Sequence, residues 1–359
     1  WRPVRFEQHL GVTIARASST RFDRRRFAGR VANYLSYFLS AILASFGIGR
    51  PDVVVAMTDP PIIGLLALAT ARRTGARFVF LCEDVFPEVA VLLEDFHNET
   101  VNRILDRINR YLLRRADAII VLGDCMRRRL VDEKGANPSR VHVIHNWADC
   151  RAIVPGPKDN AFAREHGLAD RFVLMHSGNL GMSQNLDVLI DVAAHLADRT
   201  DVTIVVVGEG ARKTTLQQAA AARGLTNIRF LPYTPKARLH ESFAAADVFL
   251  VSLQPGIEGY IVPSKVYGIL AAGRPYIAAT DASCEAATIA RDHACGRAVT
   301  PGDAGDLARQ LRWMADHPAD MQAMGQRARE AAWQFDRAVA VQAYASLFTA
   351  VCASPRRTA

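Results

Sequence analysis

Short apolar runs alternate with amphipathic stretches along most of the chain. Between residues 51 and 144 the runs are too short for helices and are bounded by turn residues, so they predict buried strands at residues 52–56, 78–82, 118–122 and 141–144. Helical periodicity predicts helices between them at residues 62–72, 102–115 and 124–133. This alternation predicts a parallel, doubly wound sheet, in which ligands bind beyond the carboxyl ends of the strands.

The same alternation begins again in the second half. It predicts strands at residues 172–176, 202–207, 228–233, 248–253 and 276–279, and helices at residues 186–196, 237–246, 266–272, 307–314, 321–333 and 338–350. Residues 148–160, with two prolines and a glycine, have the composition of a linker between the two series. A length of 359 residues also favours two domains.

The first 50 residues follow a different pattern. Residues 12–15 predict a short strand, and Arg24, Arg25 and Arg26 form a basic cluster. Residues 31–49 are almost continuously apolar and are long enough to cross a bilayer, but Asn33, three serines and two glycines dilute the signal. A buried or partly interfacial helix is therefore favoured over a membrane span.

Charge is distributed unevenly. The net charge is +8, and the first 50 residues contain nine arginines against two acidic residues, whereas the half after residue 150 is nearly balanced. A basic N-terminal half suggests an anionic partner: membrane phospholipid, a phosphorylated acceptor or nucleic acid. Nothing resembles a nucleic-acid-binding module, so nucleic acid is the least favoured of the three.

The six cysteines are scattered, without a C-x-x-C pair and without histidines at zinc-binding spacing. This pattern argues against a disulfide framework and a structural zinc site, and it is typical of a reducing cytosol. No signal peptide is visible, and no D-x-D metal dyad is present, so no metal is expected.

The most informative stretch is residues 256–278. A loop leads through Pro263, Ser264 and Lys265 into a short apolar helix, which Gly273 and Pro275 end, and a buried strand follows. A helix N-terminus carries unpaired N–H groups and binds anions readily, and a lysine there adds a full charge. The alternative is a solvated lysine on a surface helix.

Three further loops follow predicted strands. Two glycines separated by two residues let a backbone approach a phosphate closely. This spacing occurs in the loop Ser177-Gly178-Asn179-Leu180-Gly181. A second glycine-containing turn is Gly208-Glu209-Gly210. Residues 83–88 form an acidic loop around Asp84, for which spacing alone favours a role in capping the next helix. For His145, a hydrogen-bonding role near the linker is favoured over a catalytic role.

Several of these segments together resemble family-4 retaining glycosyltransferases of the GT-B fold, in particular the branch of bacterial exopolysaccharide and O-antigen enzymes. The resemblance extends from about residue 51 to residue 350 and includes residues 177–181, 208–210, 263–275, 296–299 and 301–303. It implies an α/β fold of two Rossmann-like, doubly wound parallel-sheet domains that face a cleft. The expected domains are residues 1–148 on the acceptor side and residues 149–336 on the nucleotide-sugar side, and residues 337–359 form a last helix that packs back on the first domain.

The resemblance also implies roles for individual residues. Lys265 and Ser264, which follow Pro263 in the sequence, would hold the diphosphate. Glu258 would bind hydroxyls of the donor, and Asp84 would contact the reacting sugar or the acceptor. The expected catalytic residues are therefore Asp84, Glu258 and Lys265. The remaining expected donor-site residues are Gly178, Asn179, Leu180, Gly181, Gln184, Gly208, Glu209, Gly210 and Tyr233, the last near the base.

The sequence departs from the family pattern at four positions. The family often carries two glutamates eight positions apart, and here those positions are Tyr260 and Gly268, with Glu258 two residues from the first. Where many members carry an arginine and a lysine in the first loop, this chain has Asn179 and Gln184. The phosphate charge is therefore expected to fall more heavily on Lys265 and on backbone amides.

The expected activity is transfer of a sugar from a UDP- or GDP-sugar to a lipid-linked saccharide, with retention of configuration, without a cofactor, at the cytoplasmic face of the plasma membrane. The family's first strand and glycine-rich turn are not found at the start, so the chain is expected to lack its natural N-terminus. Two alternatives remain open, a nucleotide-sugar 2-epimerase and a catalytically degenerate GT-B subunit that binds a partner. The donor sugar, the base and the acceptor are not encoded in a recognisable motif.

Overall fold

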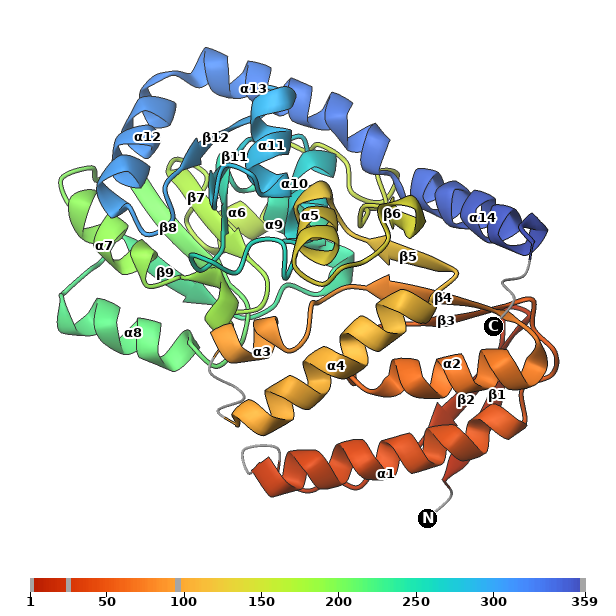
Figure 1. Cartoon of the computed structure of the whole chain (residues 1–359). Coiled ribbons are helices and arrows are strands. Elements are labelled where there is room, and N and C mark those ends of the chain that lie inside the picture. The colour runs from red at the N-terminus through yellow and green to blue at the C-terminus, as the bar shows by residue number, and fades with distance from the viewer. Residues whose placement is uncertain (1–2, 24–26, 94–97, 356–359) are drawn as a thin grey trace.

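The computed structural model describes residues 3–23, 27–93 and 98–355, and it contains two parallel sheets (Figure 1). The first sheet has the order β3-β4-β5-β6 and defines the N-terminal domain. Its strands are β3 (Val53–Ala56), β4 (Arg77–Cys82), β5 (Ala118–Val121) and β6 (Val141–Val143), and its helices are α2 (Ile63–Thr74), α3 (Glu88–Leu92), α4 (Glu99–Arg115) and α5 (Asp124–Asp132). The predicted order of the four strands and of helices α2, α4 and α5 is confirmed, whereas the short helix α3 was not predicted.

Local chemistry explains these boundaries. All four residues of β5 are buried, as expected for a central strand of a parallel sheet that is covered on both faces. Helix α4 begins where the Asn98 side chain accepts hydrogen bonds from two backbone N–H groups of the first turn. Helix α2 ends at Gly75, whose φ of +74° suits a residue without a side chain.

A hairpin and a long helix precede this sheet. Strands β1 (Val4–His9) and β2 (Val12–Ala17) pair in an antiparallel hairpin, of which the sequence predicted only the second strand. Helix α1 (Phe27–Phe46) occupies most of the apolar stretch, and among the described helices none is long and apolar enough to cross a bilayer. The basic cluster at residues 24–26 lies outside the described residues.

The second sheet has six parallel strands in the order β12-β11-β10-β7-β8-β9 and defines the C-terminal domain. The strands are β7 (Phe172–Ser177), β8 (Val202–Val207), β9 (Ile228–Leu231), β10 (Val248–Ser252), β11 (Tyr276–Ala279) and β12 (Gly296–Val299). The helices are α6 (Ala161–Glu165), α7 (Val188–His195), α8 (Lys213–Ala222), α9 (Leu239–Ala244), α10 (Lys265–Ala271), α11 (Glu285–Asp292), α12 (Ala304–Asp316) and α13 (Pro318–Ala332).

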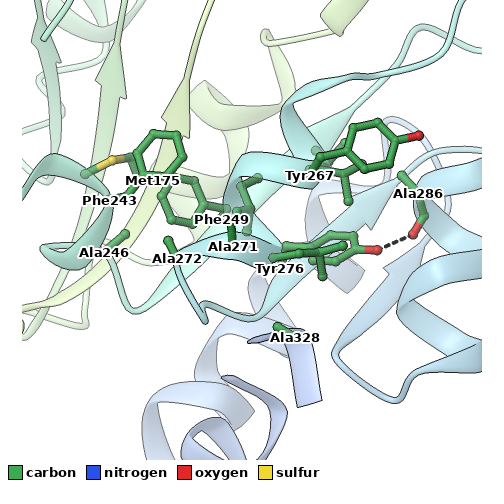
Figure 2. Close-up of a cluster of buried hydrophobic side chains, with 14 of the residues drawn as sticks. Met175, Phe243, Ala246, Phe249, Tyr267, Ala271, Ala272, Tyr276, Ala286 and Ala328 are labelled. Atoms are coloured by element: carbon green, nitrogen blue, oxygen red, sulfur yellow. Dashed lines mark hydrogen bonds between the residues drawn. The ribbon is translucent and has the colours of Figure 1, made fainter. Parts of the chain in front are cut away.

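The core of the C-terminal domain supports helix α10 from behind. Figure 2 shows Tyr267 of α10 and Tyr276 of β11 among apolar side chains of neighbouring elements, and both tyrosines are fully buried. The Tyr276 hydroxyl donates a hydrogen bond of 2.6 Å to the Ala286 carbonyl, so this buried polar group has a partner. The helix that begins with Lys265 therefore rests on a closely packed base.

The chain crosses between the two sheets twice, and the crossings lie side by side. The Ala148 N–H donates to the Phe335 carbonyl and the Arg337 N–H donates to the Ala148 carbonyl. Helix α14 (Arg337–Ala353) then returns along the N-terminal sheet (Figure 1). Its Ala340 and Val351 join a buried cluster with Val79 of β4 and Ile120 of β5.

Candidate functional site

A cavity of about 600 Å³ lies between the two domains, at the carboxyl ends of strands from both sheets. The N-terminal domain contributes Asp59, Asp84, Phe86, Val89, Ala90 and Leu93, and helix α1 adds Tyr34. The C-terminal domain contributes Gly178, Asn179, Ser183, Gln184, Ser252, Leu253, Ile261, Val262, Pro263, Ser264 and Lys265. One wall therefore carries carboxylates and the opposite wall carries an amine.

Lys265 is the first residue of α10, and its side chain is part-buried at the cavity wall. Its Nζ lies 3.2 Å from Nε2 of His176, a fully buried residue of β7. Burial and then the nearby lysine hold the pKa of His176 well below its usual range, so the neutral ring accepts the hydrogen bond. Burial lowers the pKa of Lys265 to about 7, and among the described residues no carboxylate forms an ion pair with it.

The loop after β7 lies against this ammonium group. Gly178 has a φ of +143°, and a Cβ atom at this position would lie 3.6 Å from Lys265 Nζ. The Gln184 side chain accepts a hydrogen bond of 2.9 Å from the Gly181 N–H, and the Leu180 side chain is fully buried. Leu180 therefore anchors the loop, while Gly178 and Asn179 face the cavity.

The turn after β8 supports that loop from below. A Cβ atom on Gly208 would lie 1.9 Å from the Gly178 carbonyl oxygen, and one on Gly210 would lie 2.4 Å from the Leu180 carbonyl oxygen. The Leu180 N–H also donates to the Glu209 carbonyl at 2.8 Å. These glycines allow two loops to pack backbone against backbone, and Gly208, Glu209 and Gly210 do not themselves line the cavity.

Tyr233 lies beside the same turn. Its side chain is half exposed, and its hydroxyl is 3.4 Å from the Glu209 carbonyl oxygen, while the Glu209 carboxylate pairs with Lys213 at 2.6 Å. Tyr233 thus stands outside the cavity lining, next to the loops that form its base.

On the opposite wall, Asp84 follows β4 and enters the cavity. Burial, followed by the neighbouring carboxylates of Glu83 and Asp59, raises the pKa of Asp84 to about 6. The Asp84 N–H donates to the Thr58 hydroxyl at 3.2 Å, which fixes the backbone. The interpretation of this acidic loop as a helix cap is wrong, because α3 begins after Pro87 without any side-chain cap.

Glu258 lies apart from these groups. Its side chain is buried outside the cavity lining, and its carboxylate accepts a long hydrogen bond of 3.4 Å from the Asp281 N–H. The structure therefore brings together Asp84, Lys265 and the loop from Gly178 to Gly181, but not Glu258, whose predicted contact with the donor stays a prediction.

Ser264 and His145 complete the residues named from the sequence. The Ser264 side chain is exposed, lines the cavity and forms no cap on α10, so its hydroxyl is directed neither to the core nor to the helix. His145 Nδ1 lies 3.1 Å from the Leu122 carbonyl oxygen, and its ring packs edge-on against Phe335. The predicted hydrogen-bonding role of His145 is confirmed.

Sequence reasoning missed three residues of the site. His176 precedes the glycine loop directly, and a histidine inside an otherwise apolar strand was the signal that could have identified it. Asp59 follows β3 as Asp84 follows β4, so its position at a strand end carried the same signal. Tyr34 comes from α1, and nothing in its local pattern indicates that it reaches the cavity.

The two halves of the chain match two family models of known proteins. Residues 2–147 match the glycosyl transferase 4-like domain, and residues 158–331 match the glycosyl transferases of group 1. The chain is 28% identical over 294 residues to the probable glycosyltransferase WbjE of Pseudomonas aeruginosa, an alignment that covers 81% of this chain and 73% of WbjE. It is 25% identical to the putative colanic acid biosynthesis glycosyl transferase WcaI of Escherichia coli, over 66% of this chain and 59% of WcaI.

Solved structures with the same architecture include HepE from Anabaena, with a TM-score of 0.73 at 18% identity over 92% of this chain and 85% of HepE. Sucrose-phosphate synthase from Thermosynechococcus elongatus has a TM-score of 0.72 at 18% identity, over 97% of this chain and 86% of that protein. The fold is therefore GT-B, two parallel-sheet α/β domains that face a cleft. Together with the two family models, it identifies the chain as a glycosyltransferase of the group 1 and 4-like type, which does not favour the 2-epimerase alternative.

Proposed function

We propose that this glycosyltransferase moves a sugar from a UDP- or GDP-sugar to a hydroxyl of a lipid-linked saccharide, in the synthesis of a bacterial surface polysaccharide. The observation that carries the proposal is the position of Lys265, a part-buried amine without a carboxylate partner among the described residues, in a cavity between two domains. The HepE structures were determined with UDP and with UDP-glucose, and WcaI is named for colanic acid biosynthesis.

Lys265 would hold the diphosphate. A unit charge about 4 Å from a phosphate oxygen gains roughly 4 kcal/mol at an effective dielectric constant of 20, before desolvation is counted. Helix α10 has only 7 residues, so its dipole contributes less than the side-chain charge does. The Ser264 hydroxyl and the backbone of Gly178 and Asn179, which line the cavity with Lys265, would supply further hydrogen bonds to the phosphates.

Asp84 would face the transferred sugar or the acceptor. With a pKa of about 6, its carboxyl group is mostly ionised near neutral pH, where it can accept a hydrogen bond from a sugar hydroxyl. Its position on the wall opposite Lys265 would place the reacting bond between the carboxylate and the leaving diphosphate.

Catalysis would retain the anomeric configuration, as the resemblance to retaining glycosyltransferases implies. It would require no metal, because the charge of the leaving diphosphate would be stabilised by Lys265 and by backbone amides. Two measurements check these points: the anomeric configuration of the product by proton NMR, and turnover with and without EDTA. An inverted product, or activity that EDTA abolishes and Mg²⁺ restores, would contradict the respective point.

A thermal-shift screen with UDP, GDP and their sugars tests the function directly. We expect one base to raise the melting temperature, and its sugar nucleotide to be consumed when an acceptor lipid is supplied. Stabilisation without turnover in the full-length protein would instead indicate a binding subunit, and no stabilisation by any of the nucleotides would contradict the proposal.

We also propose a peripheral contact with the inner face of the plasma membrane through the N-terminal segment. Along α1, Leu35, Leu39, Leu43 and Phe46 are each more than half exposed, and their spacing of three or four residues places them on one face of the helix. On the adjacent hairpin, the Leu10 side chain is 91% exposed. Arg5, Arg16 and Arg21 line a surface groove nearby. Arg16 is paired with Glu7, so Arg5 and Arg21 would supply the positive charge for anionic lipids.

A further inference from the structure

The turn formed by residues 257–261, which leads into Lys265, is held by the other domain. Within the turn, the Tyr260 N–H donates to the Ile257 carbonyl at 3.1 Å, and Gly259 has a φ of +79°. A Cβ atom on Gly259 would lie 2.6 Å from Cγ of Arg129 and 2.9 Å from the Cys125 carbonyl oxygen. Helix α5 of the N-terminal domain thus packs directly against the backbone of this turn.

Two side chains of the N-terminal domain hold Tyr260, Arg129 on α5 and Glu133 at the C-cap of that helix. The Tyr260 hydroxyl donates a hydrogen bond of 2.7 Å to Oε2 of Glu133, and the Arg129 guanidinium lies 4.7 Å from the centre of the Tyr260 ring. Arg129 also donates to the Glu258 carbonyl at 3.2 Å and forms an ion pair with Glu133. One connected group of residues therefore spans the domain interface. We term it the interdomain latch, and its members are Arg129, Glu133, Glu258 and Tyr260.

The latch explains a departure from the family pattern. Position 260 is one of the two at which the resembling family often carries glutamate, and a glutamate here would place its carboxylate beside that of Glu133. A tyrosine hydroxyl instead donates to Glu133, while its ring offers a face to Arg129. The carboxylate in this part of the interface thus comes from the N-terminal domain.

One hydrogen bond connects the latch to both walls of the cavity. The Val85 N–H, adjacent to Asp84, donates to the Tyr260 carbonyl at 2.8 Å. Tyr260 in turn precedes Lys265 by five residues, and Ile261 to Lys265 line the cavity continuously. The turn that contacts α5 is therefore also bonded to the acidic wall and continuous with the segment that ends at Lys265.

We propose that Tyr260 is a positioning residue, which sets the separation of Asp84 and Lys265 by docking the 257–261 turn on α5. The proposal rests on the proposed function, because it assumes that a sugar nucleotide binds between these two groups. It adds a residue that contacts no substrate itself but controls the geometry of the donor site.

The test uses Tyr260→Phe, which keeps the ring beneath Arg129 and removes only the hydroxyl. We expect the Kd for the sugar nucleotide found in the thermal-shift screen to rise about tenfold, the scale of a lost hydrogen bond to a charged group. Tyr111→Phe is the matched control, since it removes an exposed hydroxyl that contacts Arg72 on the surface of the N-terminal domain. The control should bind as the wild type does.

Two readouts separate positioning from a general loss of stability. In Tyr260→Phe, the pH midpoint of donor binding should move upward from about 7, because a loosened turn exposes Lys265 to water. In a double-mutant cycle with Glu133→Ala, the double variant should bind no more weakly than the weaker single variant. Additive losses, or a lower melting temperature with unchanged Kd and pH midpoint, would overturn the proposal.

Amide hydrogen exchange distinguishes failure of this proposal from failure of the proposed function. If the wild type binds no sugar nucleotide, the proposed function fails, and the latch is then judged by exchange alone. Faster exchange of the Val85 amide in Tyr260→Phe, but not in Tyr111→Phe, supports the latch. Unchanged exchange at Val85 overturns it.

Discussion

Lys265 combines a part-buried amine with a neutral hydrogen-bond partner. A carboxylate partner would fix the charge but would also compete with a phosphate for it. His176 accepts one N–H without cancelling the charge, and its burial keeps it neutral. In the free site, the Lys265 ammonium group is therefore partly desolvated at a cost in free energy, and a bound anion would offset that cost.

This state predicts a pH dependence of donor binding. The pKa of Lys265 is about 7 in the free protein, and a bound diphosphate raises it, so only the protonated form binds well. Affinity should be full below about pH 7 and should fall by up to tenfold per pH unit above it, with uptake of a proton on binding. Titration calorimetry in buffers of different ionisation enthalpy measures both quantities.

The diphosphate of a sugar nucleotide has no group that titrates between about pH 7 and pH 9, so a change of affinity in this range reports a group of the protein. Asp84, with its pKa of about 6, titrates at a lower pH than Lys265 does. The variant Asp84→Asn should therefore still lose donor affinity above pH 7. A flat affinity between about pH 7 and pH 9 would show that Lys265 does not bind the phosphates.

Among the elements, the loops after β7 and β8 form the base of the site as one unit. Gly208 is the tightest contact, since any side chain there would meet the Gly178 carbonyl. We expect Gly208→Ala to lower stability by about 1 to 3 kcal/mol through backbone strain and to weaken donor binding by displacing residues 178–181. Thermal unfolding and calorimetry measure the two effects.

Gly224→Ala is the matched control for this change. Gly224 also has a positive φ, of +63°, but open space surrounds it. It should lose a little stability and no donor affinity. Equal behaviour of the two variants would mean that the loop contact is unimportant for the site.

The elements also show which features a sequence can predict. The helix start at Lys265 and the strand-to-loop order around Gly178 were predictable, because they depend on local signals such as Pro, Gly and apolar runs. The partnership of Lys265 with His176 and of Tyr260 with Glu133 was not, because these pairs join segments 89 and 127 residues apart. No periodicity in the sequence encodes such contacts. Gly208 could be predicted as a turn residue, but its packing against the Gly178 carbonyl could not.

On the scale of the whole molecule, the two crossings between domains are joined to each other at Ala148 and Asp336. The cavity adjoins the interdomain latch, since its lining includes Ile261, the residue after Tyr260, so changes in the separation of the domains would act on it directly. Asp84 lies in the N-terminal domain and Lys265 in the C-terminal domain, and the latch connects the two domains.

The exposed face of α1 predicts binding to anionic vesicles. The protein should float with vesicles that contain phosphatidylglycerol, and the bound fraction should fall as salt is added. Leu39→Gln with Leu43→Gln should reduce this fraction, because both side chains are more than half exposed. Val341→Gln, an equally exposed apolar position on α14, is the control. Unchanged flotation of the α1 variant would place the contact elsewhere.

The most direct test of the site is the affinity of Lys265→Met for the sugar nucleotide that stabilises the wild type, measured by calorimetry near pH 7. Lys236→Met serves as the control, since Lys236 is an exposed lysine of the same domain. We expect Lys265→Met to bind about 30- to 100-fold more weakly, which corresponds to about 2 to 3 kcal/mol, and the control to bind normally. Equal affinity of Lys265→Met and the wild type would contradict the assignment of Lys265 to the diphosphate.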